Sequence, residues 1–164
     1  MSKICKIKDI LIGDGIPKVC VSVVSDNHQA IITDIIRLMD YDIDIIELRI
    51  DYFKELLNQQ KLKELFKMIA TLEMKQALIL TYRSVKEGGL GELSHEEYIN
   101  LYKIALESGA FDIYDVELSS GTNAIITLNN MIHEADRKVI MSSHDFTRTP
   151  SLDTMLEKIK QMDS

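Results

Sequence analysis

A histidine and several charged side chains stand at the ends of apolar runs in this sequence, where they could carry out acid–base chemistry. His144 follows the run Val139-Ile140-Met141-Ser142-Ser143, and only twenty residues come after it. An imidazole titrates near neutrality, so it can remove a proton and later return it. Arg49 and Arg83 end two earlier runs, and arginines bind anionic groups through paired hydrogen bonds. These residues indicate a site for proton transfer on a small anionic molecule.

The polar residues keep the side-chain parity of the apolar runs before them. Alternate residues of a strand share a face, so Glu47 and Arg49 continue the face of Ile45. The same parity holds for the other ends: Ser22 after Cys20, Arg83 after Ile79 and Thr81 with Glu87 in the loop beyond, Asp115 and Glu117 after Ile113, and Ser142 and His144 after Ile140. Five strands that turn polar at the same end predict one shared site at their carboxyl ends.

The same charged residues could instead only neutralise one another. Charges on apolar strands are costly unless they are paired or face a polar cavity. The set is nearly balanced and consists of Glu47, Arg49, Arg83, Glu87 and Glu117. An ion-pair rim without a ligand is therefore the alternative to a binding site.

Apolar runs alternate with segments of helical period along the whole chain, which predicts strand–helix units and a parallel sheet. Nearly continuous apolar strands are typical of sheets that are covered on both faces. An N-terminal hairpin is expected over Ile4–Ile16, with its turn at Lys8-Asp9 or at Gly13-Asp14-Gly15. The expected strands are Val19–Val24, Ile43–Ile50, Ala77–Tyr82, Asp112–Leu118 and Lys138–Ser143; the expected helices are Asn27–Met39, Lys54–Leu72, Ser94–Glu107, Thr122–Ala135 and Ser151–Gln161.

Two closures fit five strand–helix units: an open doubly wound sheet or part of a (β/α)₈ barrel. A complete barrel needs about 250 residues, so the length of 164 residues favours the open sheet. The polar ends of all five strands favour the barrel. Ser94 with Glu97 predicts a capping box, and Ser151 is expected to cap the last helix.

Composition limits the class of protein. The length predicts a single domain over residues 1–164. A net charge of −7 argues against a nucleic-acid or anionic-membrane surface, and no apolar run approaches the ~20 residues of a membrane span. Cys5 and Cys20 have no metal-type spacing and are expected to be reduced thiols in the cytoplasm. No spacing suggests a metal site. Gly88-Gly89-Leu90-Gly91 lacks a nucleotide-binding pattern and is expected to be a mobile loop or lid.

Four ordered tracts resemble the type I 3-dehydroquinate dehydratases. They are Ile46–Phe53, Thr81–Gly89, Asp115–Leu118 and Met141–Pro150, including the motif Ser142-Ser143-His144-Asp145-Phe146. The resemblance covers essentially the whole chain but only the first five of the family's eight strand–helix units. It implies a (β/α)₈ barrel with a hairpin across its bottom, often in a homodimer. It also implies dehydration of 3-dehydroquinate in the shikimate pathway, without a metal or organic cofactor.

The resemblance also implies roles for single residues. A lysine would form an imine with the substrate ketone, and His144 would shuttle the proton and assist loss of the hydroxyl. Glu87 would position and support that histidine. The substrate and its charge network would be held by Glu47, Arg49 and Arg83, with Ser22 as a weaker match.

The family's imine lysine would fall beyond Ser164. Lys138 is expected at the wrong end of its strand, Lys158 and Lys160 on the following helix, and Lys86 in a loop, so none is expected to replace it. We therefore expect a C-terminally incomplete barrel that is inactive and self-associating as this chain. The alternatives are a non-catalytic ligand-binding or assembly fragment, and another Schiff-base barrel lyase of the aldolase type.

Overall fold

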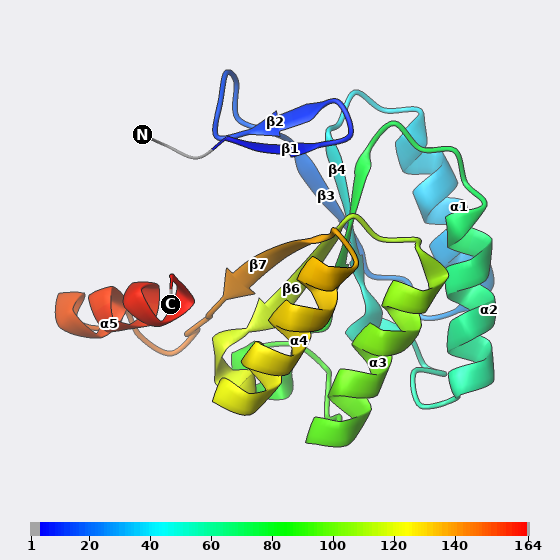
Figure 1. The fold of residues 1–164 in the computed structure, drawn as a ribbon. Coiled ribbons are helices and arrows are strands. Elements are labelled where there is room, and N and C mark those ends of the chain that lie inside the picture. Colours follow the sequence, from blue (N-terminus) through cyan, green and yellow to red (C-terminus); the bar gives the residue numbers. More distant parts are fainter. Residues whose placement is uncertain (1–3, 164) are drawn as a thin grey trace.

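A parallel sheet is the centre of the fold. The structure is a computed structural model that describes residues 4–163. Within that range five parallel strands lie side by side in the order in which they occur along the chain (Figure 1). The strands are β3 (Cys20–Val23), β4 (Ile45–Arg49), β5 (Ala77–Thr81), β6 (Ile113–Glu117) and β7 (Lys138–Ser142). Each lies inside its predicted range.

The strand order decides between the two closures. A doubly wound sheet reverses its strand order at a switch point, whereas a barrel adds each new strand beside the previous one. The order β3-β4-β5-β6-β7 has no reversal. Outward-facing strand residues such as Leu48, Leu80 and Val116 share one apolar core with the helices. The winding is that of part of a (β/α)₈ barrel, and the open-sheet alternative is wrong.

A helix follows each of the five strands, and both predicted helix caps are present. The helices are α1 (His28–Met39), α2 (Gln59–Ala70), α3 (His95–Ser108), α4 (Thr122–Glu134) and α5 (Leu152–Met162), with short 3₁₀ turns η1 (Ile50–Tyr52), η2 (Val85–Glu87) and η3 (Leu118–Ser120). Ser94 and Glu97 form the expected capping box, and Ser151 caps α5. The predicted start of α2 at Lys54 is wrong, because the side chain of Asn58 accepts the Lys61 N–H and caps the helix there.

The predicted hairpin closes the amino-terminal end of the sheet's inner face. Strands β1 (Cys5–Ile7) and β2 (Ile10–Ile12) pair across a turn at Lys8-Asp9, where Lys8 has φ +51°. Ile7 is buried against the inward-facing residues at the strand starts, which are Ile45, Ala77, Ile79 and Ile113. The Lys8 ammonium donates to the Gln76 carbonyl at 2.7 Å and pairs with Asp112 at 3.1 Å. The inner face therefore has an apolar floor, and only its carboxyl-terminal half is free for polar groups.

The last helix lies apart from the other four (Figure 1). No residue of α5 is buried, and Leu152, Leu156 and Ile159 are exposed on it. The Lys158 ammonium donates to the Ser143 hydroxyl at 2.9 Å. Within residues 4–163, no helix is long and apolar enough to cross a membrane.

Replacement of the residue that caps α3 tests how much this cap contributes to the stability of the folded chain. Ser94→Ala removes the hydroxyl that accepts the Glu97 N–H, so the free energy of unfolding should fall by about 1 kcal/mol in urea titrations. Ser151→Ala is the matched control, because it removes the same kind of cap from a helix with no buried residue. An equal loss in both variants would contradict the expectation.

Candidate active site

The carboxyl-terminal half of the inner face is polar on all five strands. Strand register places the residues side by side: Ser22 lies beside Glu47, Arg49 beside Thr81, Thr81 beside Asp115, and Glu117 beside Ser142. Because the strands are parallel, all these side chains reach the same end of the sheet. The polar residues that were predicted to share one end of the sheet therefore do lie there.

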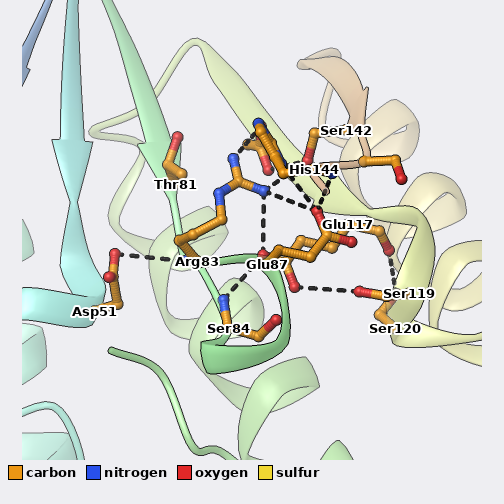
Figure 2. Close-up of polar contacts among 12 residues, drawn as sticks. Asp51, Thr81, Arg83, Ser84, Glu87, Glu117, Ser119, Ser120, Ser142 and His144 are labelled. Atoms are coloured by element: carbon orange, nitrogen blue, oxygen red, sulfur yellow. Dashed lines mark hydrogen bonds and ion pairs between the residues drawn. The ribbon is translucent and has the colours of Figure 1, made fainter. Parts of the chain in front are cut away.

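Arg83 is the buried centre of this surface (Figure 2). Its Nη1 donates to Glu117 Oε1 at 3.1 Å and to the Ser142 hydroxyl at 2.8 Å, and its Nη2 donates to Asp115 Oδ2 at 3.1 Å. Burial opposes the charge, but the carboxylates of Asp115 and Glu117 outweigh it and raise the pKa of Arg83. The guanidinium is thus a charged group that is shielded from solvent by its carboxylate partners.

The partners of Arg83 are themselves connected. The Ser142 hydroxyl accepts from Arg83 and donates to Asp115 Oδ1 at 2.7 Å. Glu117 Oε1 also accepts the backbone N–H of Ser84 at 2.9 Å, which joins the β5 loop to β6. Burial raises the pKa of the Asp115 carboxyl, and Arg83 and Ser142 partly offset that rise. Three neighbouring strands are therefore joined through one cation.

His144 and Glu87 form the second part of the site. Glu87 Oε2 accepts both the backbone N–H of His144 and its ring Nδ1, each at 2.9 Å (Figure 2). Arg83 Nη1 lies 3.6 Å from the same oxygen. The Glu87 carboxylate is 4% exposed, whereas the His144 side chain is 37% exposed. With Nδ1 held as a donor, Nε2 is the ring nitrogen that can exchange a proton with a bound molecule.

Glu47 belongs to a separate cluster on β3, β4 and β5. Its carboxylate accepts a hydrogen bond from Ser22, and Thr81 Oγ1 donates to Glu47 Oε1 at 2.7 Å. Thr81 was not among the predicted site residues, although its parity marks it as inward-facing. The cluster gives three oxygen-bearing side chains that can hydrogen-bond to hydroxyl groups.

Arg49 pairs with a residue that the sequence pattern did not single out. Its Nε and Nη2 donate to Asp51 Oδ1 and Oδ2, both at 2.8 Å. The hydrogen bond with Asp51 raises the pKa of Arg49. Asp51 also accepts the backbone N–H of Leu90 at 3.1 Å. Asp51 shares the parity of Glu47 and Arg49, so parity was the signal that could have identified it.

The glycine-rich tract after β5 forms a tight turn in a loop, and its expected mobility and role as a lid stay predictions. Gly91 N donates to Arg83 O at 3.0 Å, and Gly89 N donates to Ser84 O at 2.9 Å. A Cβ at Gly89 would lie 2.1 Å from the Arg83 carbonyl oxygen, and one at Gly91 would lie 2.2 Å from the Tyr82 ring. These glycines are needed because backbone and ring approach them closely.

The arrangement combines one exposed proton-transfer group with a buried charge network. Within the described part of the chain, no group of three or more His, Cys, Asp or Glu side chains is arranged to hold a metal ion. The ion-pair alternative describes Arg83 well, because its buried guanidinium is paired with the carboxylates of Asp115 and Glu117. It does not describe His144, whose ring is partly exposed beside a buried carboxylate. The site can therefore support acid–base chemistry at one point.

Comparisons with known proteins identify relatives that match nearly the whole of this chain. Residues 19–164 match the sequence model of the family described as type I 3-dehydroquinase. The 3-dehydroquinate dehydratase of Clostridium novyi (strain NT) is 35% identical over 160 residues, which are 98% of this chain and 63% of that protein. The protein of the same name from Escherichia coli O6:K15:H31 (strain 536 / UPEC) is 33% identical over 162 residues, with coverage of 99% and 64%. The chain thus spans less than two thirds of the length of these relatives.

Solved structures agree with this assignment. The crystal structure of type I 3-dehydroquinate dehydratase from Clostridium difficile with covalent modified comenic acid superposes with a TM-score of 0.94 at 35% identity, covering 99% of this chain and 64% of that one. The 3-dehydroquinate dehydratase of Enterococcus faecalis superposes with a TM-score of 0.90 at 30% identity, with coverage of 96% and 65%. The partial (β/α)₈ barrel predicted from the sequence is confirmed.

Removal of the central cation should be strongly destabilising. Arg83→Met leaves the buried Asp115 and Glu117 without their cation, so the free energy of unfolding should fall by about 3–5 kcal/mol in urea titrations. The control Arg37→Met, at an exposed position on α1, should change it by about 0–1 kcal/mol. Similar values for the two variants would contradict a buried network that depends on Arg83.

The Cys20 thiol on β3 should react slowly. Although the residue as a whole is exposed, desolvation of its thiol and, less so, the neighbouring Glu47 carboxylate raise the pKa of Cys20 to about 11. Because the thiolate is the nucleophile, alkylation by iodoacetamide should keep accelerating until about pH 11 in the folded chain. In the urea-unfolded chain it should level off near the ordinary thiol value of about 8.5. Peptide mass spectrometry measures both profiles, and coincident profiles would contradict the expectation.

Proposed function

The chain belongs to the type I 3-dehydroquinase family, and from this premise we propose that the whole protein converts 3-dehydroquinate to 3-dehydroshikimate and water. The relatives from Clostridium novyi and Escherichia coli bear the name 3-dehydroquinate dehydratase, a hydro-lyase activity. The observation that carries the proposal is the pairing of His144 with the buried Glu87 at the carboxyl end of β7. That pair has the geometry of a general base with an orienting carboxylate.

The proposed mechanism separates imine formation from proton transfer. A lysine amine condenses with the substrate ketone, with loss of water, and the imine makes the neighbouring C2 proton acidic. His144 Nε2 takes that proton and returns it to the C1 hydroxyl, which leaves as water. Hydrolysis of the imine then releases the enone product and restores the amine. Glu87 supports the positively charged ring between the two proton transfers.

The other predicted residues take supporting roles in this proposal. Glu47 and Ser22 bind substrate hydroxyls, because their oxygens lie together on the inner face. Arg49 contributes positive charge for the substrate carboxylate while it is held by Asp51. Arg83 contributes through the charge network, since its guanidinium is 8% exposed and already paired with carboxylates.

We assign the imine lysine to the part of the family fold that follows residue 164. Lys138 begins β7 at the floor of the barrel, and Lys158 on α5 donates to Ser143, whose parity is opposite to that of His144. Lys86 lies on η2 at an exposed position. None of the three is buried, whereas a nucleophilic lysine is typically placed in desolvated surroundings. On this proposal, residues 1–164 are part of one barrel domain and do not complete the reaction alone.

A second candidate is a non-catalytic assembly or ligand-binding module. The observation in its favour is the exposed apolar side of α5, together with the inner face of a sheet whose five described strands do not close into a barrel. Such surfaces associate readily, so we propose that the isolated chain self-associates.

The free thiols of Cys5 and Cys20 support a cytoplasmic location.

The function is tested by joining this chain to the part of the fold it does not contain. Residues 1–164 fused to the C-terminal part of the Clostridium novyi relative should convert 3-dehydroquinate, detected by enone absorbance. His144→Ala in the same fusion should lower kcat by about 10²–10⁴-fold, because it removes the general acid–base group. His133→Ala, on α4, is the control and should leave kcat unchanged.

The 164-residue chain is assayed alongside, with borohydride trapping of any imine. We expect neither enone absorbance nor a lysine adduct by mass spectrometry. An adduct on Lys86 or Lys158 would contradict the lysine assignment. A folded fusion that binds 3-dehydroquinate in calorimetry but does not convert it would contradict the dehydratase and favour the binding module.

A further inference from the structure

Two loops of the site touch through a glycine and an exposed aromatic ring. Gly88 follows η2, with φ +84°, and Phe146 lies in the loop after β7. A Cβ built on Gly88 would lie 2.5 Å from Phe146 Cε2 and 2.7 Å from its Cδ2. The edge of the ring therefore rests on the Gly88 backbone, in space that any side chain at this position would occupy.

Ordinary burial does not explain the position of Phe146. The residue is 78% exposed, so little apolar area is removed from water. Its ring is nearly parallel to that of His144, with 6° between the planes and 6.2 Å between the centroids. This separation is within the range of interacting aromatic pairs. Phe146 thus contacts the Glu87–Gly88 segment at its edge and faces the histidine.

The Glu87–Gly88 segment holds the loop after β7 at two points. Glu87 Oε2 accepts from the backbone and the ring of His144, and Gly88 supports Phe146 two residues further on. A carboxylate accepts hydrogen bonds over a broad range of directions, so it does not fix the plane of a ring by itself. A second contact on the same loop restricts that freedom.

We propose that Gly88 and Phe146 are positioning residues that hold the His144 ring with Nδ1 as the donor to Glu87 and Nε2 free. The inference deepens the proposed function, because the ring held in this way is the proposed proton carrier. Gly88 serves in two ways: it adopts positive φ without strain, and it leaves room for the aromatic edge. Phe146 acts through His144.

The test is the tautomer of His144, read from the ¹⁵N signals of its ring in the 164-residue chain at alkaline pH. Wild type should show the Nδ1–H form. Gly88→Ala and Phe146→Ala should each lose that single form and give a mixture of tautomers. The double variant should match Phe146→Ala alone, because the methyl group added at position 88 then has no ring to displace. Phe146→Tyr, which keeps the ring, should retain the wild-type signals.

Gly109→Ala is the matched control for backbone strain. Gly109 caps α3 with φ +68°, and a Cβ there would meet nothing within 4 Å. It should leave the His144 signals unchanged. Unchanged signals in Phe146→Ala would overturn the proposal, as would an equal effect of Gly88→Ala with and without the Phe146 ring. If Gly88→Ala does not fold, the pair Phe146→Ala and Phe146→Tyr still decides, since position 146 is exposed.

The spectra require neither substrate nor turnover. Loss of the Nδ1–H form in the variants would support the positioning role even if the fusion enzyme proved inactive. Conversely, an active fusion would support the dehydratase proposal, while an unchanged tautomer of His144 in the Phe146→Ala chain would contradict the positioning role. The two proposals therefore fail separately.

Discussion

The arginine at position 83 must be neutralised inside the protein, and much of the site follows from that requirement. A cation removed from water is stable only when carboxylates and hydroxyls surround it. Asp115 and Glu117 come from the next strand and Ser142 from the one beyond, so satisfying the charge fixes three strands relative to one another. Glu87 lies, like Arg83, in the segment that follows β5. Its carboxylate is near the Arg83 guanidinium and also accepts a hydrogen bond from the His144 ring.

Strand parity divides the inner face into two functional layers. At the start of β4, β5 and β6 the inward residues are small or aliphatic, and the hairpin covers them with Ile7. Two to four residues later along the strands, residues of the same parity are polar and also point inward. The floor needs apolar packing to stay dry, and the upper layer needs paired charges to stay ordered. One alternation along each strand provides both conditions.

Parity and apolar runs predicted the strands and the inward position of Arg83 and His144, but they left an open sheet and a barrel both possible. The barrel followed from the family resemblance. Parity and apolar runs could not predict which residues the charged side chains would pair with. Arg49 turns to Asp51, two residues away, because a bidentate geometry is available there. The close packing around the glycines after β5 was not predicted, since it depends on a carbonyl and a ring that come close only in the folded chain. The start of α2 was missed because the apolar pattern begins before its Asn58 cap.

Consecutive strand pairing has a consequence for synthesis on the ribosome. Each strand from β4 onward pairs with the one made just before it, so every new unit finds its partner already present. Arg83 gains Asp115 and Glu117 once β6 emerges, before Ser142 and His144 exist. The Glu87 carboxylate must wait for β7. The nascent barrel thus neutralises its buried cation before it acquires its histidine.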